Sequence, residues 1–183
     1  MADVKIQDLL TATTVADTNL FIVEDNADTK KITRANLRLN LMTFPATQVP
    51  SSDPNTLDDY EEGTWAPEVI GATTAGVGTY TDRLGWYTKI GNVVHFNIYI
   101  VWSTHTGTGF IRISLPPFTS ISGTFFPLNI TPTGLNFTNQ LSAMVVANSQ
   151  FLQLYTYSAG GSIVGLNMDT AAAMYISGSY ITS

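Results

Sequence analysis

The chain has 183 residues, of which 12% are charged and 44% are hydrophobic, and it contains no cysteine. This length allows one domain with a buried core and an appendage, and the missing cysteines exclude disulfides and thiolate metal sites. The net charge is −6 and Lys and Arg are not clustered, so we expect no nucleic-acid binding, which depends on clustered basic side chains. We also expect no signal peptide and no membrane insertion, because no basic segment precedes an apolar run and no stretch reaches about 18 consecutive apolar residues.

The first 42 residues read as a small attachment segment. The sequence predicts a β-hairpin with a loop of about five residues, formed by a first strand at residues 20–24, of which the first four are apolar, a polar turn at residues 25–28 and a second strand at residues 30–33. Thr33 can cap a helix over residues 34–42, in which Leu37 and Leu41 share one face. This segment offers too little apolar surface to fold alone, so we expect it to dock onto another protein.

Residues 43–62 are interpreted as an extended linker. This range contains Pro45, Pro50 and Pro54 among Ser, Thr and Asn, with little apolar periodicity. An acidic run, residues 58–62, forms the end of this range.

Residues 63–183 are predicted to form an antiparallel, jelly-roll-like β-sandwich. The clearest strand covers residues 93–102, where buried-type and polar-type residues alternate strictly and Trp102 falls on the apolar face with Phe96. A Gly91-Asn92 turn joins it to a preceding strand at residues 86–90. Further strands are expected at residues 111–115, 125–131, 141–147, 151–157, 163–168 and 174–181.

Charge is missing from the end of the sequence. Arg112 is the last basic residue, and Asp169 is the only acidic residue after it, so the last 71 residues carry one charged side chain. Exposed strand edges normally carry charges that prevent edge-to-edge pairing. This deficit predicts a module that associates with copies of itself.

Few residues could support catalysis or hold a metal. Glycoside hydrolysis usually needs two carboxylates, and the β module offers only Glu68, Asp82 and Asp169. The acidic run of residues 58–62 lacks the alternating pattern of a calcium loop, and two histidines per chain, His95 and His105, cannot supply a three-histidine zinc site. We therefore expect no enzyme activity, no metal and no cofactor, although an axial metal or a site shared between subunits stays an alternative.

Aromatic side chains are the remaining candidates for binding. Tyr and Trp in polar strands can stack on sugars or anchor protein contacts, and the candidates chosen here are Tyr99, Trp102, Tyr155 and Tyr157. Tyr175 and Tyr180 belong to the same set of strand aromatics. Burial in the core or at a subunit interface is the competing interpretation for all of them.

One stretch resembles a known family. Residues 57–67 read Leu-Asp-Asp-Tyr-Glu-Glu-Gly-Thr-Trp-Ala-Pro and are similar to the stretch that opens the C-terminal β domain of bacteriophage tail-fibre and related virion fibre proteins. The motif residues are Asp58, Asp59, Tyr60, Glu61, Glu62, Gly63, Thr64 and Trp65. The likeness continues through residues 78–80, 86–92, 107–109 and 176–180, and the segments at residues 5–10, 17–23 and 30–33 are similar to fibre attachment modules.

The resemblance implies a homotrimeric virion component that is assembled in the host cytoplasm. Residues 1–42 would bind other virion proteins, and the β domain would face outward as a short tail fibre that attaches to a host-surface glycan. No long shaft separates the linker from the β domain, so a capsid-decorating head fibre or a tail adaptor with a structural role only is the main alternative. A polysaccharide-degrading tailspike is the third.

Overall fold

The computed structural model describes residues 20–25, 28–33, 57, 59–157 and 160–182. The chain divides into two compact units, Met1–Thr43 and Phe44–Ser183. All regular elements within the described ranges are β-strands. A helix long and apolar enough to cross a membrane is not found among these residues.

The first unit contains the predicted hairpin. Strand β1, Leu20–Asp25, pairs antiparallel with β2, Asp28–Thr33. The ladder continues to the Asp25↔Asp28 pair and leaves two residues between the strands, so the expected five-residue loop was wrong. The helix expected at residues 34–42 and most of the linker fall outside the described residues.

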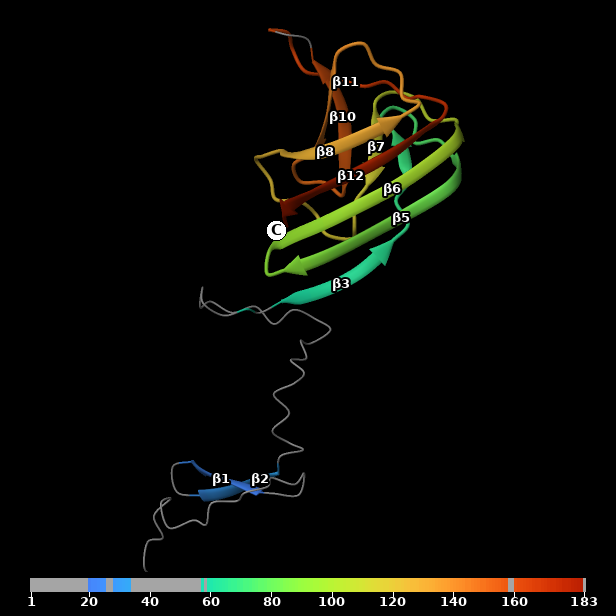
Figure 1. Ribbon diagram of the computed structural model, residues 1–183. Helices are drawn as coiled ribbons and strands as arrows, with labels where there is room; N and C mark the ends of the chain where they lie inside the picture. Colours follow the sequence, from blue (N-terminus) through green and yellow to red (C-terminus); the bar gives the residue numbers. More distant parts are fainter. Residues whose placement is uncertain (1–19, 26–27, 34–56, 58, 158–159, 183) are drawn as a thin grey trace, which may run out of the picture. The chain divides into compact units, whose positions relative to one another are not determined.

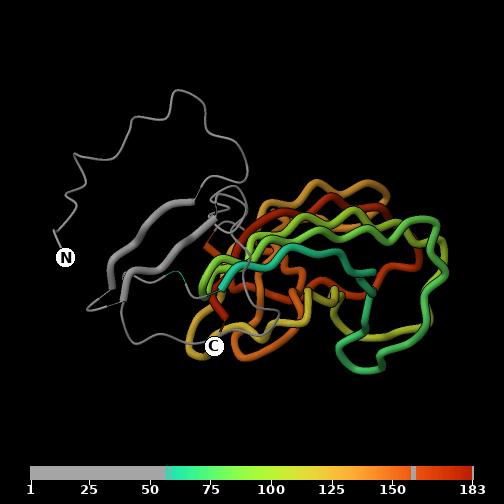
Figure 2. The backbone as a smooth tube through the Cα atoms, turned by 90° about the horizontal axis from the view of Figure 1, so that it is seen from below, coloured from blue at the N-terminus to red at the C-terminus, as the bar shows by residue number. Residues whose placement is uncertain are grey.

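The second unit is one antiparallel sheet that curls on itself (Figures 1 and 2). Its strand order is β3-β5-β6-β12-β8-β9-β10-β7-β4, and β11 pairs with β10. The strands are β3 Tyr60–Trp65, β4 Val69–Gly71, β5 Gly78–Ile90, β6 Val93–His105, β7 Ile111–Ser114, β8 Phe126–Thr133, β9 Gln140–Val145, β10 Phe151–Tyr157, β11 Val164–Gly165 and β12 Ala172–Ile181.

Strand β8 forms the corner of this curled sheet. Its first residues, Phe126 to Leu128, pair with β9, whereas Asn129 to Thr133 pair with β12. The sheet therefore turns within one strand, and β7 and β10 lie behind β12 and cross it steeply, with β11 at the upper end of β10 (Figure 1). The fold is all-β with the curvature of a half-barrel, and the core lies inside the curl.

The core confirms the alternation read from the sequence. Every second residue of β6 from Val94 to Trp102 is buried, while His95 and Asn97 are exposed. The opposite wall of the core comes from β7, β9 and β10 on the other half of the sheet. The core residues of that wall are Ile111, Ile113, Ala143, Val145, Leu152 and Leu154.

Several strand boundaries differ from the prediction. Strand β3 begins at Tyr60, inside the range expected to be linker, and β5 covers 13 residues where only residues 86–90 were expected. Strand β11 covers only Val164–Gly165 within the expected 163–168. Polar and glycine-rich stretches such as residues 78–85 become strand because they pair with the long partner β6, although the register shifts on both sides of Tyr80.

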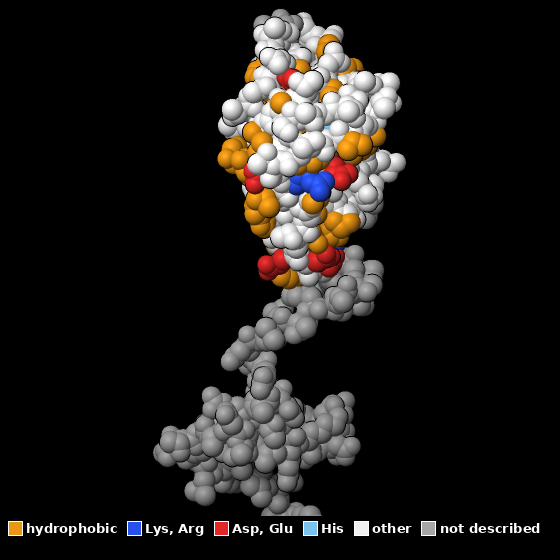
Figure 3. Space-filling view, turned by 90° about the vertical axis from the view of Figure 1, so that its right-hand side faces the viewer, with side chains coloured by type: hydrophobic (Ala, Val, Ile, Leu, Met, Phe, Trp, Pro, Cys, Tyr) orange, Lys and Arg blue, Asp and Glu red, His pale blue; other side chains and the backbone are white. Residues whose placement is uncertain are grey.

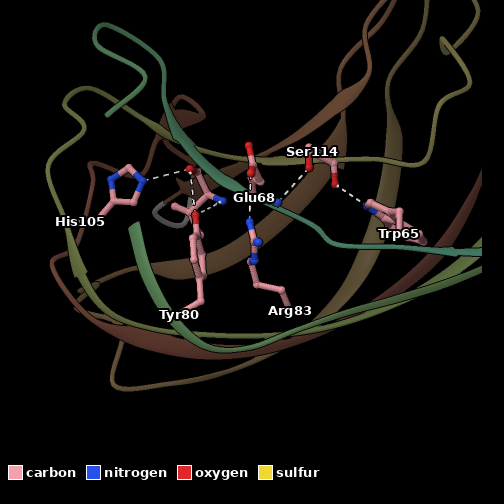
Figure 4. A network of polar contacts seen from close by, with 7 residues as sticks. Trp65, Glu68, Tyr80, Arg83, His105 and Ser114 are labelled. Carbon is pink, nitrogen blue, oxygen red and sulfur yellow. Dashed lines mark hydrogen bonds and ion pairs between the residues drawn. The ribbon is translucent and has the colours of Figure 1, made fainter. Parts of the chain in front are cut away.

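The two ends of the curled sheet meet at a seam. Strands β3 and β4 are the outermost strands of the path, yet only Ala66, Pro67 and Glu68 separate them in the sequence. Trp65 Nε1 donates to the Ser114 carbonyl at 3.2 Å, and the Glu68 backbone N–H donates to Ser114 Oγ at 2.8 Å (Figure 4). The chain thus crosses from one half of the sheet to the other while bonded to β7.

Three side chains from β5 and β6 hold the far side of the seam (Figure 4). Arg83 Nη1 donates to Glu68 Oε1 at 2.9 Å, and the Val69 N–H donates to the Tyr80 hydroxyl at 2.9 Å. The buried His105 lies with Nε2 2.9 Å from the Val69 carbonyl, and its Nδ1 accepts from the Gly107 N–H at 2.9 Å. This pattern fixes the tautomer with the proton on Nε2 and ties β4 to both halves of the sheet.

Charged side chains are unevenly spread over the surface of the β unit. Figure 3 presents one face, on which acidic and basic groups gather at mid-height and below, while the upper end is almost entirely uncharged or hydrophobic. This distribution follows the sequence, in which Asp169 is the only charged residue after Arg112.

Candidate functional site

The outward face of the β3-to-β8 half of the sheet carries an ordered set of aromatic and amide side chains. Because alternate residues of β6 and β12 point into the core, the residues between them point outward. The register places Trp86 opposite Asn97, Asn97 opposite Ser177, and Ser177 opposite Asn129. A parallel row, two residues along each strand, consists of Leu84, Tyr99, Tyr175 and Thr131.

Two of these aromatic residues stack on each other. The rings of Tyr99 and Tyr175 have centroids 4.6 Å apart and an interplanar angle of 18°. A hydrogen bond with Tyr175 raises the pKa of the Tyr99 hydroxyl above its ordinary value. Tyr175 is 56% exposed and Trp86 is 48% exposed, and together with Tyr99 they place three aromatic rings close together on one face, where rings can bind a ligand.

Two shallow hollows lie on this face and share Trp86 and Asn97. One, of about 380 Å³, is lined by Tyr99, Tyr175, Asn129 and Ser177 together with the shared pair. The other, of about 430 Å³, is lined by Glu62, Thr64, Thr88 and His95 together with the same pair. We call the two hollows together the outer groove.

The structure brings together only part of the predicted binding set. Tyr99 lies in the outer groove, but Tyr155 and Tyr157 belong to β10 on the other half of the sheet. Trp102 is 1% exposed and its Nε1 donates to the Asp169 carbonyl at 3.1 Å. The expectation for Trp102 is therefore corrected: its ring is part of the core, as its place on the apolar side of β6 already indicated.

Trp86 was missed as a binding candidate. The signal was present in the sequence, because the Gly91-Asn92 turn pairs Ile90 with Val93 and therefore Trp86 with Asn97 four residues further along each strand. Asn97 was already assigned to the polar face. The side chain of Trp86 had to share that face.

The described motif residues at the start of the β unit stabilise the edge of the sheet that β3 forms. Asp59 forms an ion pair with Lys89, and both residues are buried, with 8% and 4% of their surface exposed. The Asp59 carbonyl also accepts from the Gly91 N–H at 2.9 Å. Asp59 thus joins the motif to the β5–β6 turn, while Asp58 lies outside the described residues.

The two glutamates of the motif bind tyrosine hydroxyls. The Tyr87 hydroxyl donates to Glu61 Oε1 at 2.5 Å, and the Tyr60 hydroxyl donates to Glu62 Oε1. Burial, together with the hydrogen bond to Glu61, raises the pKa of Tyr87 to about 12. The carboxylates of the motif therefore point to separate partners.

Gly63, Thr64 and Trp65 pair with the similar sequence Gly85-Trp86-Tyr87 in the antiparallel direction. Gly63 lies opposite Tyr87, and Trp65 lies opposite Gly85. Each ring covers the glycine across from it, and the two rings lie 6.1 Å apart. Aromatic cover over a cross-strand glycine stabilises a sheet edge, and it explains why this part of the motif needs both residue types.

Titratable groups are spread out in the part of the chain that the structure describes. Within it, no three side chains of His, Cys, Asp or Glu gather closely enough to hold a metal ion. His95 lines the outer groove, whereas His105 belongs to the seam.

Neither a protein-family model nor a curated protein sequence matches the chain. The outer groove is therefore interpreted from its own residues.

Proposed function

We propose that this protein is a short homotrimeric fibre of a phage-like virion and attaches to a host-surface glycan through the outer groove. The observation that carries the proposal is the exposed Trp86 and the stacked Tyr99–Tyr175 pair among amide and hydroxyl side chains. Aromatic rings bind the apolar face of a sugar ring, while amides and hydroxyls exchange hydrogen bonds with its hydroxyl groups. This combination is the surface chemistry of a sugar-binding site.

The virion part of the proposal depends on the resemblance of residues 57–67 to fibre proteins. In this proposal the curled sheet is a jelly-roll-like sandwich, and residues 1–42 bind other virion proteins. The division of the chain at Thr43 into two compact units supports separate attachment and display roles.

Association of the chain with copies of itself is proposed from the distribution of charge, and the number of three chains is proposed from the resemblance of residues 57–67 to fibre proteins. One charged side chain in the last 71 residues leaves strand ends and loops without the charges that normally prevent association. Light scattering should report a particle of three chains, and a particle of 19.8 kDa would contradict the trimer.

Competition for adsorption tests the attachment role. Purified protein should reduce adsorption of the particle to its host, and it should bind at least one class of host-surface glycan on an array. Particles that lack the protein, adsorb normally and lose integrity would instead favour a head fibre or a tail adaptor. Shortening of capsular or O-antigen polymer by the protein would favour a polysaccharide-degrading tailspike.

A further inference from the structure

The two hollows of the outer groove lie side by side and share two lining residues. Trp86 and Asn97 line both hollows, so a ligand that fills one hollow contacts the same two side chains as a ligand that fills the other. The hollows have similar volumes, about 380 and 430 Å³. The groove therefore suits a chain of linked units that passes over Trp86 better than it suits one compact ligand.

The hollow beside the tyrosine pair is lined without Asp, Glu, Lys, Arg or His. Its polar groups are the amides of Asn97 and Asn129 and the hydroxyls of Thr131, Ser177 and the two tyrosines. Amides and hydroxyls can donate and accept hydrogen bonds but supply no countercharge. A ligand carboxylate, sulfate or phosphate placed here would lose hydration without gaining an ionic partner.

The rest of this face disfavours anions more strongly. The two basic side chains of β5 are Arg83 and Lys89. They pair with the buried residues Ile100 and Val94, so they belong to the inward face of the sheet and not to the outward face of Trp86. Strands β3, β6, β8 and β12 contain no Lys or Arg. The outward positions of these five strands therefore include no Lys or Arg, while Glu62 lines the second hollow and the whole chain has a net charge of −6.

We infer that the outer groove binds a neutral oligosaccharide of at least two sugar units, with one ring on Trp86, and that it discriminates against acidic sugars. This inference rests on the proposed attachment function and specifies its ligand. The occupant is a glycan and not a second copy of the chain, because the amides of Asn97 and Asn129 and the hydroxyls of Thr131 and Ser177 lie among the rings, and sugar hydroxyls supply the hydrogen bonds that these groups need when they are covered.

The test uses the full-length protein and two sets of oligosaccharide probes. Neutral oligomers of glucose, galactose and N-acetylglucosamine are compared with sialylated and uronate-containing oligomers of equal length by calorimetry or array binding. Wild-type protein should bind a neutral oligomer more tightly than its acidic counterpart, and the dimer more tightly than the monosaccharide. Trp86→Ala and Tyr175→Ala should each weaken binding by roughly tenfold or more, as for truncation of an aromatic anchor.

Matched variants separate the groove from general effects on folding. Phe137→Ala removes another exposed aromatic side chain, which lines a different hollow, and should leave binding unchanged. Trp86 is half-exposed, so its replacement should leave the circular dichroism spectrum unchanged. Glu62→Gln should increase binding of acidic oligomers relative to wild type.

The outcomes distinguish this inference from the function on which it rests. Preference for acidic oligomers would overturn the inference while attachment through the outer groove stands, and binding that is unaffected by Trp86→Ala would overturn the inference and move attachment to another surface. A change of particle mass in Trp86→Ala would identify the face as a subunit interface and would also overturn it. Wild-type protein that binds no glycan and does not compete for adsorption would overturn the proposed function itself.

Discussion

Replacing Gly85 by alanine tests the role of the glycine–aromatic pairs at the edge of the sheet. A Cβ atom built at Gly85 would lie 2.6 Å from two ring atoms of Trp65, closer than real Cβ contacts allow. Trp65 cannot easily move, because its Nε1 donates to Ser114 and its ring packs against Tyr87 and Phe96. The ring or the strand must therefore shift.

The expected cost combines two opposing effects. Overpacking of this kind lowers the free energy of unfolding by about 1–3 kcal/mol, and loss of glycine flexibility in the unfolded chain offsets roughly 0.4–1 kcal/mol of it. A net loss of about 1–2 kcal/mol should lower Tm by roughly 3–10 °C in a unit of this size. Gly63→Ala should have a similar cost, because a Cβ atom there would lie 2.5 Å from the Tyr87 hydroxyl, which is bonded to Glu61.

Urea unfolding followed by tryptophan fluorescence and circular dichroism measures these differences. The decisive comparison is Gly85→Ala in a Trp65→Val background, where the space over residue 85 is free and the alanine should cost nothing. An equal cost with and without the Trp65 ring would refute the proposed steric cause.

Three further variants test buried groups of the β unit. Lys89→Met should lower the free energy of unfolding by about 3–5 kcal/mol, because buried Asp59 loses its partner. Adding Asp59→Leu should recover most of that loss, and a double variant without recovery would contradict a buried ion pair. The free energy of unfolding should fall as pH rises from about 10 to 12, because the unfolded chain releases the Tyr87 proton near pH 10 and the folded chain releases it at about 12. A Tyr87→Phe variant whose free energy of unfolding has the same pH slope would contradict this. Trp102→Ala should cost about 3–5 kcal/mol in chemical unfolding, and a Trp102→Phe variant of normal stability that loses glycan binding would contradict its assignment to the core.

The glycan interpretation could be only partly anticipated from the residues. Tyr99 was selected because tyrosine in a polar strand can serve binding, and the same reasoning selected Trp102, although the alternation of β6 places Trp102 among Phe96, Ile98 and Ile100. Residue type alone does not separate a ring in the core from a ring on the surface. The position of a residue in the alternation of its strand does separate the two, and it places Trp102 in the core.

Tyr155 and Tyr157 show a different limit of the sequence. They alternate in β10 as Tyr99 does in β6, but β10 pairs with β9, β7 and β11 on the other half of the sheet. No local pattern states which strands become neighbours when contacts form between distant segments. The partner of Tyr99 is therefore Tyr175 from the end of the chain.

The β class, the alternation of β6, the Gly91 turn and the scarcity of charge follow from the amino-acid sequence alone, because each depends on neighbouring residues or on composition. Contacts between distant segments were needed to show that β3 and β4 end the same curled sheet, that Asp59 is buried with Lys89, and that Tyr175 joins Trp86, Asn97 and Tyr99 on one face. These features depend on the pairing of β5, β6, β12 and β8. That pairing is selected by burial of a common core, which no single segment contains.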